Sequence, residues 1–333
     1  MSKVLSVSVA AYNAQDFLRK CLDSFVEVKQ HDLLEILVVD DGSKDHTKEI
    51  AEEYVEKYPD FIRLIAKENG GHGSTINAAL EKAKGKYFRV IDSDDWVDPS
   101  DMDALLDYLK DAKTDMVLGN YREVYPDHTH ELDVHQNYEY YKSYSFDEMN
   151  PKFLFAMHSI CILTENLRKL GRKIPEHCFY ADTSYFYNAA CAADTVSFIP
   201  GCVYQYRLGR EGQSVSAEGW YKHIEDFLKI ERSMMDYYEG PDKSIPSKVK
   251  REYLYQIILT RWRLIFGCFL QFNKSEKDGM LFKFYQDVKN NYPELINSLY
   301  LQPKRQPVLW NLEIMLPIMR ALFTVWHHVK GSN

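Results

Sequence analysis

The chain has 333 residues, six cysteines and a formal net charge of −8. This length allows about two domains with a sizeable core, and the negative charge argues against nucleic acid as the main partner. The cysteines form no C-x-x-C pair, which excludes the usual spacing of a zinc site and favours a cytosolic protein with reduced thiols. The first residues have no signal-peptide pattern, and no uninterrupted apolar run reaches the ~20 residues of a membrane-spanning helix.

Apolar strand-like segments alternate with amphipathic segments over the first 120 residues. Asn13 is expected to cap the first helix, and the pair Asp98-Pro99 is typical of the start of the fourth. The alternation predicts a mostly parallel sheet with right-handed crossovers. Strands are expected, with a helix in each interval, over residues 4–11, 35–41, 61–66, 88–91 and 115–119.

Three carboxylates follow the expected strand at Phe88–Ile91, namely Asp92, Asp94 and Asp95. Carboxylates this close repel one another, and a divalent cation would relieve the repulsion. Mg²⁺ and Mn²⁺ prefer oxygen ligands and often keep coordination positions open for substrate phosphates. The stretch therefore fits either a metal–diphosphate site or a solvated acidic turn that leads to the helix cap at Asp98.

Polar residues also lie at the ends of two other expected strands, as Tyr12-Asn13 and Asp40-Asp41. Since the carboxyl ends of parallel strands lie on one edge of a sheet, these residues and the acidic cluster are expected to meet there. The glycine-rich loop 70–73 opens the next helix. One interpretation is that the loop brings backbone N–H groups or the His72 imidazole near a phosphate or sugar. The alternative is a plain strand–helix turn.

Residues 121–218 are more irregular than the residues before them. The three histidines between residues 128 and 135 match no familiar metal-ligand spacing, which favours a solvated loop. Asp182 precedes a helix rich in aromatic residues and alanine. A strand is expected over 196–206, and a polar, flexible loop over 207–216.

The chain is expected to be helical from Trp220 onward, with a break near residues 240–247. Residues 301–333 carry four Lys or Arg against one Glu, together with large apolar side chains. A basic amphipathic end can lie on an anionic membrane surface or pack on the core as a terminal helix, and both alternatives stay open.

Four short motifs follow one another in the first 120 residues: Val7–Asn13, Leu37–Asp45, Asn69–Gly73 and Asp92–Asp95. In order and spacing they resemble the family 2 glycosyltransferases of bacterial surface-polysaccharide type. Asp182, Tyr204-x-Tyr206-Arg207 and Ser214-x-Ser216 match the second half of that family more weakly. The resemblance implies a GT-A fold, a nucleotide-diphosphate sugar donor, a divalent cation and inversion at the anomeric carbon.

The resemblance also implies contacts to the nucleotide sugar. Ala10 and Tyr12 would line the nucleobase pocket. Asp41, with Asp40 beside it, would accept a hydrogen bond from the base, typically uracil. The further contacts implied are Asn13, Asn69, Gly71, His72 and Ser93.

The acidic residues receive roles by the same resemblance. Asp92 and Asp94 would form the D-x-D motif that holds ribose and metal, with Asp95 as a further candidate ligand. Asp182 would be the general base that inverting transfer needs on the acceptor hydroxyl.

The loop 207–216 would close over the diphosphate, where Arg207 or Arg210 would neutralise charge as the nucleotide leaves. Two positions depart from the family pattern. Ala181 stands where a glutamate often precedes the base, and Ala10 stands where proline is usual.

The sequence thus predicts a cytosolic, Mn²⁺- or Mg²⁺-dependent hexosyltransferase. It would move a sugar from a UDP-sugar to a saccharide or lipid-linked saccharide in surface polysaccharide assembly. The expected parts are a nucleotide-sugar-binding half (1–120), an acceptor-binding and catalytic half (121–218) and a helical C-terminal region (219–333), which would be the part in peripheral contact with the inner face of the membrane.

Two alternatives remain. A sugar nucleotidyltransferase usually opens with a glycine-rich phosphate loop that carries Arg and Lys, where this chain has Ala11–Ala14. A non-catalytic sugar-nucleotide-binding or membrane-associated module would bind nucleotide without turnover.

Overall fold

The computed structural model divides into two compact units, which are described separately below. One comprises Met1–Gln213 with Ile245–Lys250, and the other comprises Ser214–Ser244 with Arg251–Asn333. The structure describes residues 3–149, 154–209, 217–240, 245, 247–271, 277–300 and 316.

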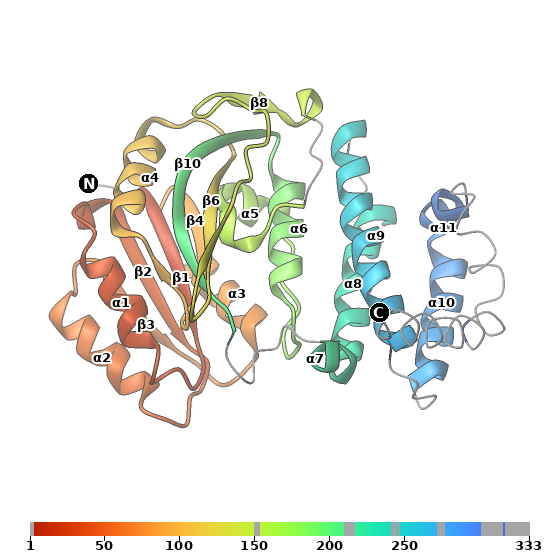
Figure 1. Ribbon diagram of the computed structural model, residues 1–333, viewed down its shortest axis with the longest axis horizontal. Coiled ribbons are helices and arrows are strands. Elements are labelled where there is room, and N and C mark those ends of the chain that lie inside the picture. Colours follow the sequence, from red (N-terminus) through yellow and green to blue (C-terminus); the bar gives the residue numbers. More distant parts are fainter. Residues whose placement is uncertain are drawn as a thin grey trace. The chain divides into compact units, whose positions relative to one another are not determined.

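The first unit alternates strands and helices through its first half and becomes less regular after residue 124 (Figure 1). Its strands are β1 (Leu5–Ala11), β2 (Leu34–Asp40), β3 (Ile62–Ala66), β4 (Tyr87–Asp92), β5 (Trp96–Val97), β6 (Met116–Val124), β7 (Thr129–Leu132), β8 (Ser143–Ser145), β9 (Ile160–Leu163) and β10 (Thr195–Arg207). Its helices are α1 (Leu18–Val26), α2 (Thr47–Lys57), α3 (His72–Lys82), α4 (Pro99–Asp111), α5 (Thr164–Leu170) and α6 (Asp182–Ala192).

The described strands form one mixed sheet in the order β3-β2-β1-β4-β9-β6-β10-β5, with β7 on β6 and β8 on β10. The pairs β3–β2, β2–β1 and β1–β4 are parallel, as the alternation predicts, and so is β6–β10. The short strand β9 runs antiparallel to both β4 and β6 and was not predicted from the sequence. The result is the mixed, parallel-rich α/β sheet flanked by helices that the sequence predicts.

Burial explains why the parallel half is so regular. Every residue of β2 is buried, because helices cover both faces of a parallel sheet. In Figure 1, α1, α2 and α4 lie on one side of the sheet and α3, α5 and α6 on the other. Side chains of α1, α2 and α4 pack with β1 and β2 into one apolar cluster.

The two expected helix caps have different outcomes. The Asp98 carboxylate accepts hydrogen bonds from the backbone N–H groups of Ser100 and Asp101, which confirms the start of α4. The expected cap at Asn13 is wrong, because α1 begins only at Leu18. The Asn13 side chain instead accepts a hydrogen bond from the backbone N–H of Lys44, 2.8 Å away in the loop after β2.

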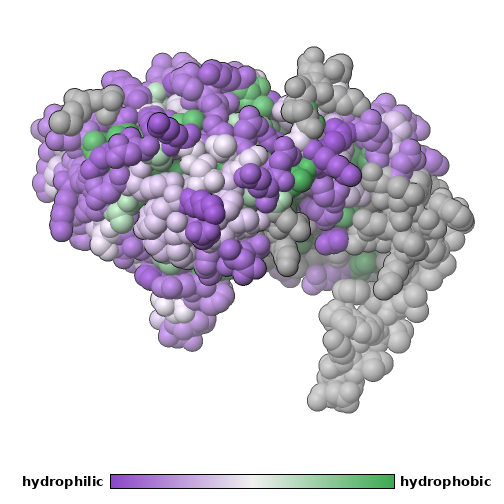
Figure 2. Space-filling model, turned by 90° about the horizontal axis from the view of Figure 1, so that it is seen from above, coloured by the Kyte–Doolittle hydropathy of each residue, from purple (hydrophilic) through white to green (hydrophobic). Residues whose placement is uncertain are grey.

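The described part of the second unit is helical, as expected from Trp220 onward. It contains α7 (Ala217–Lys222), α8 (Ile224–Glu239), most of α9 (Lys248–Gln271), α10 (Asp278–Asn291) and α11 (Pro293–Tyr300). No helix of the described residues is both long enough and apolar enough to cross a membrane. The basic, aromatic end expected over 301–333 lies outside the described residues, apart from Leu316. Figure 2 shows a mainly hydrophilic surface over the first unit, with small scattered apolar areas.

Candidate functional site

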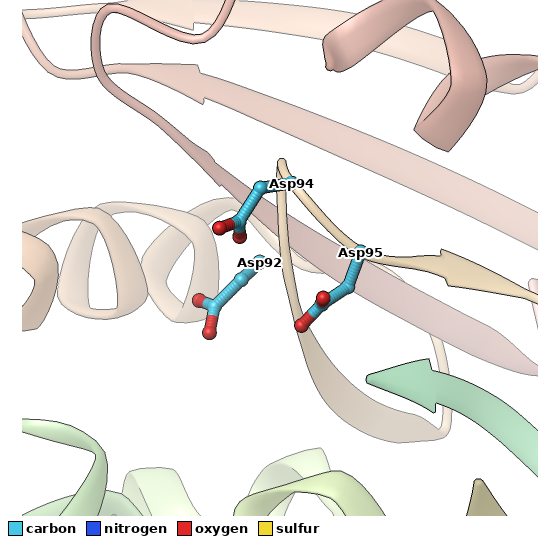
Figure 3. A group of neighbouring side chains, drawn as sticks. All are labelled: Asp92, Asp94 and Asp95. Atoms are coloured by element: carbon cyan, nitrogen blue, oxygen red, sulfur yellow. The ribbon is translucent and has the colours of Figure 1, made fainter. Parts of the chain in front are cut away.

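A turn at the carboxyl end of β4 brings three carboxylates together. One oxygen from each of Asp92, Asp94 and Asp95 lies within 4.8 Å of the others. Figure 3 shows the three side chains leaving this single turn with their carboxylates directed toward one region. Asp92 and Asp94 are half-buried and Asp95 is buried. We call these three residues the acid turn.

Asp95 ties the acid turn to β10. Its Oδ2 accepts a hydrogen bond from the Tyr204 hydroxyl at 2.6 Å, and its Oδ1 accepts one from the backbone N–H of Arg207 at 2.7 Å. Burial and the neighbouring carboxylates of Asp94 and Asp92 raise the pKa of Asp95 well above its usual range. The two donors offset this only in part, so the turn carries a concentration of negative charge that favours a proton or a cation.

The glycine-rich loop delivers an imidazole to the acid turn. His72, the first residue of α3, places Nε2 2.9 Å from Asp92 Oδ1. Burial lowers the pKa of His72, but Asp92, followed by Asp182 and Asp94, raises it above the usual value overall. Burial raises the pKa of Asp92, but His72 and then His158 lower it below the usual value overall. The loop therefore places the His72 imidazole beside Asp92, and its approach to a phosphate or sugar stays a prediction.

Asp41 organises the same loop from the end of β2. Its Oδ1 accepts hydrogen bonds from Lys67 Nζ at 2.7 Å, from the Gly70 N–H at 3.0 Å and from the Ser74 hydroxyl at 3.2 Å. Its Oδ2 accepts one from the Gly71 N–H at 2.8 Å. Because a carboxylate has about four acceptor positions, an additional donor would find room mainly at Oδ2.

Other predicted residues stabilise the loops around Asp41. The Asn69 side chain donates to the Asp41 carbonyl at 3.0 Å, and Asp40 Oδ1 accepts from the Ser43 N–H at 3.2 Å. Gly71 has a positive φ of 80° just before α3, a conformation that glycine adopts without strain. These contacts shape the edge of the sheet near the acid turn.

The end of β1 supplies an exposed aromatic ring to this edge. Tyr12 is 52% exposed, whereas Ala10 is half-buried and Ser93 is buried. The Ala10 carbonyl accepts a hydrogen bond from the Ser93 N–H at 3.2 Å, which joins β1 to the acid turn. Asn13, with a positive φ of 49°, links the end of β1 to the loop after β2.

Arg207 supports the acid turn from the end of β10. Its Nε donates to the Asp94 carbonyl at 2.8 Å, and its guanidinium lies 5.2 Å from the Phe17 ring and 5.0 Å from the Trp96 ring. These contacts fix the side chain against the turn. Arg210 lies outside the described residues.

Asp182 is the first residue of α6 and is half-buried. It acts on the pKa of His72 together with Asp92 and Asp94, so it lies in the same electrostatic environment as the acid turn. A carboxylate at a helix N-terminus is stabilised in its ionised form by the helix dipole. Ala181, where the family often has glutamate, is fully buried.

Two residues of the site were missed by sequence reasoning. Lys67 directly follows β3 and forms an ion pair with Asp41. The only sequence signal for its role was its position at the carboxyl end of a strand. Tyr204, fully buried, donates to Asp95 and accepts a hydrogen bond from the Asp92 N–H at 3.2 Å. It occurs in a matched motif, but nothing in its spacing indicates which residue it would contact.

The acid turn fits a hard divalent cation. Its donors are carboxylate oxygens, which Mg²⁺ and Mn²⁺ prefer. The mutual repulsion that raises the pKa of Asp95 would be relieved by a bound positive charge. Asp92 and Asp94 are half-buried, whereas Asp95 is 1% exposed, so Asp92 and Asp94 are the more accessible ligands.

The fold is the GT-A fold. Residues 1–349 of S. aureus TarS, solved in complex with UDP-GlcNAc, superpose with a TM-score of 0.70 at 19% sequence identity. The match covers 98% of this chain and 92% of that one. The family model for "Glycosyl transferase family 2" matches residues 6–171. The chain belongs to this family.

The chain is also similar to curated glycosyltransferases over part of their length. The chain is 30% identical over 221 residues to "Putative glycosyltransferase EpsH" of Bacillus subtilis, which covers 61% of this chain and 60% of EpsH. It is 27% identical over 240 residues to "Poly(ribitol-phosphate) beta-glucosyltransferase" of Bacillus spizizenii, which covers 67% of this chain and 36% of that protein. The chain thus spans less than two thirds of both relatives.

Proposed function

We propose that this chain is a metal-dependent, inverting glycosyltransferase that uses a UDP-sugar as donor. The observation that carries the proposal is the meeting of the acid turn, His72 and Asp182 at the carboxyl edge of the sheet. These residues lie at the end of β4, in α3 and in α6, and Asp92, Asp182 and Asp94 all raise the pKa of His72. Ligands of open α/β sheets bind at this edge.

Asp92 and Asp94 are proposed to hold the cation, with Asp95 as a further ligand or as the anchor of the turn. Bound there, Mn²⁺ or Mg²⁺ would neutralise the charge of the leaving diphosphate. Ser93, through its bond to Ala10, and Arg207, through its bond to Asp94, keep the turn in place. The contact of Arg210 with the diphosphate stays a prediction from the sequence.

The nucleobase is proposed to lie against Tyr12 beside Ala10. The exposed ring of Tyr12 offers a stacking surface, and the Asp41 Oδ2 lone pair offers an acceptor for a base N–H. Asp40, Asn13, Asn69 and Gly71 are proposed to shape this pocket through the loop contacts described above, without a direct role in chemistry.

Asp182 is proposed as the general base. An ionised carboxylate near the anomeric carbon would accept the proton of the acceptor hydroxyl as that oxygen attacks, while the nucleotide diphosphate leaves on the opposite face. Its position at the start of α6 supports this role, because the helix dipole favours the ionised form.

The names of similar proteins support the substrate class. TarS was solved with UDP-GlcNAc, and the Bacillus spizizenii relative is named for glucosyl transfer to poly(ribitol-phosphate). We therefore propose a UDP-sugar donor and a surface saccharide, polymer or lipid-linked saccharide as acceptor. A cytosolic location and a membrane contact of residues 301–333 stay predictions from the sequence.

Calorimetric titration with UDP, GDP and CDP, each with Mn²⁺ and with EDTA, tests the proposal. We expect binding that needs Mn²⁺ and prefers UDP, followed by slow release of UDP from a UDP-sugar in water. Binding without any release or transfer of sugar would favour the non-catalytic alternative. Absence of binding to all three nucleotides would contradict the proposal.

A further inference from the structure

Tyr206, near the end of β10, packs against a histidine in an aromatic group. Its ring stacks on His158 with centroids 4.2 Å apart and an interplanar angle of 26°. His158, in the short 3-10 turn Met157–Ser159, also contacts Tyr204 at 4.6 Å and Tyr121 at 5.1 Å. Three tyrosines therefore surround one imidazole.

The His158 ring is a fixed and uncharged support for Tyr206. Burial lowers the pKa of His158 to about 4, so the ring is neutral near pH 7. The His158 carbonyl accepts a hydrogen bond from the buried guanidinium of Arg89, which holds the backbone at this point. A ring stacked on such a support has few accessible rotamers, so its hydroxyl is held in place.

The Tyr206 side chain lies beside the acid turn. Its ring contacts the Tyr204 ring with centroids 6.4 Å apart, and its two neighbours in β10, Tyr204 and Arg207, both donate hydrogen bonds to Asp95. Among the described residues the Tyr206 hydroxyl has no hydrogen-bond partner. Burial raises the pKa of Tyr206, and Asp95, Asp92, Asp182 and Asp94 raise it further, so the phenol keeps its proton. The side chain thus presents a neutral donor within reach of the electric field of both the acid turn and Asp182.

A transferred sugar would occupy the space between these acids. In the proposed function, the acid turn binds the diphosphate end of the donor and Asp182 faces the acceptor hydroxyl. The sugar links those two positions. A neutral hydroxyl there suits a sugar hydroxyl, because it donates a hydrogen bond without adding charge that would compete for the cation.

We propose that the Tyr206 hydroxyl donates a hydrogen bond to the transferred sugar of the donor and helps to select it. This inference rests on the proposed function. Because the stack on His158 fixes the ring before the donor binds, little rotamer entropy is lost when the bond forms. Tyr206 would touch the sugar and leave the nucleotide to Tyr12 and the acid turn.

Tyr206→Phe tests the proposal, because it removes only the hydroxyl and keeps the stack. Tyr121→Phe is the matched control. Tyr121 also packs on His158. Burial and then Glu123 raise the pKa of Tyr121 to about 12, and no residue of the acid turn is among the causes. The probes are UDP, UDP-GlcNAc, UDP-glucose and UDP-galactose, each titrated calorimetrically with Mn²⁺, together with the rate of UDP release from each UDP-sugar.

For Tyr206→Phe we expect an unchanged Kd for UDP and a Kd about 2- to 10-fold weaker for the preferred UDP-sugar, with slower UDP release, as for one lost hydrogen bond. Tyr121→Phe should leave both values as in the wild type. The thermal midpoint of each variant checks that the fold is retained.

Two results would overturn the inference while leaving the proposed function intact. One is an equal loss of affinity of Tyr206→Phe for UDP and for the UDP-sugar. The other is wild-type affinity and rate for every probe in a protein that binds and hydrolyses a UDP-sugar. A wild-type protein that binds no probe would instead overturn the proposed function, and this inference with it.

Discussion

One acidic side chain in each unit, Asp92 in the first and Glu231 in the second, is held in the opposite protonation state. In the first unit, Asp92 lies at a strand end, and His72 lowers its pKa against the effect of burial. In the second unit, Glu231 of α8 is fully buried. There, burial raises the pKa of Glu231 to about 8, although Arg261 and Trp262 lower it in part. Asp92 is thus held in its ionised form, whereas Glu231 keeps its proton near neutral pH.

This contrast predicts that substitutions in the two units affect different properties of the protein. Changes to the acids of the first unit should alter binding and turnover more than the free energy of unfolding. A change at Glu231 should alter the free energy of unfolding and its pH dependence without affecting nucleotide affinity. The predictions below test each side of the contrast.

Asp94→Ala should have the largest effect. It removes a half-buried carboxylate of the acid turn, so the dependence of UDP binding on Mn²⁺ and all sugar transfer should be lost. Calorimetry with Mn²⁺ and with EDTA measures this loss. Asp60→Ala, at an exposed acid just before β3, is the control and should bind UDP as the wild type does. Unchanged Mn²⁺-dependent binding by Asp94→Ala would refute the metal assignment.

Asp182→Asn should affect the chemical step alone. The amide keeps the size of the side chain but cannot accept the acceptor proton, so we expect transfer to fall about 10²- to 10⁴-fold with donor affinity retained. The rate of UDP release in the presence of acceptor, with the Kd for UDP, measures both effects. Asp111→Asn, exposed at the end of α4, serves as the control. Retained turnover would move the base to another residue.

Glu231→Gln should change how stability depends on pH. The folded pKa of about 8 lies above the unfolded value of about 4.3, so the folded state keeps a proton that the unfolded state releases. This contribution to stability is full below pH ~4 and is lost as pH rises toward ~8, at up to about 1.4 kcal/mol per pH unit. The glutamine variant should lack this decline and be more stable than the wild type at pH 8.

Thermal unfolding midpoints of wild type and Glu231→Gln between pH 5 and pH 8 measure this difference. Glu225→Gln, exposed on the same helix, should keep the wild-type slope. Parallel pH profiles for wild type and Glu231→Gln would show that Glu231 ionises in the folded protein as it does in the unfolded chain. That outcome would remove the contrast between the two units.

Tyr204→Phe should have the smallest effect on nucleotide binding. It changes a side chain of β10 that is hydrogen-bonded to the acid turn. The change removes the donor to Asp95 and the acceptor for the Asp92 N–H. A buried group that loses its partner costs about 1–3 kcal/mol. We expect a lower thermal midpoint and weaker Mn²⁺-dependent UDP binding together. A lower midpoint with unchanged binding would mean that Tyr204 supports the fold and has no influence on the acid turn.

The sequence predicts the parallel half of the sheet well, because β1, β2 and β4 bury nearly all of their residues and are therefore visible as apolar runs. It misses the short strands β5, β7, β8 and β9, since only pairing with other segments defines them. The loop expected around the three histidines is therefore wrong at Thr129–Leu132, which forms β7. The sequence prediction also ends β6 too early, because residues 120–124, which include Asn120, Arg122 and Glu123, stay in the strand through their pairing with β10 and, from Tyr121 on, with β7.

The candidate site divides in the same way. Residues at or just after the end of a strand, such as Asp92 and Asp41, could be expected at the carboxyl edge from topology alone. Asp182 could be found only by resemblance, because its position depends on how α6 packs. The contacts of Asp41 with Lys67 and with the Gly70 and Gly71 N–H groups were not readable, since they depend on the conformation of a loop.

The short strand β9 has a consequence for how such proteins diverge. On β4 it pairs with Tyr87 and Phe88 alone. The strands β3-β2-β1-β4 are therefore connected to β6 and β10 through a short stretch of backbone pairing at the amino end of β4. Mutations that reshape one side are therefore weakly transmitted to the other through backbone pairing. Further links across this region are the hydrogen bonds that Tyr204 and Arg207 of β10 donate to Asp95. Substitutions on the side of β6 and β10 can therefore accumulate while β1 to β4 keep their pairing, provided that these two bonds are retained.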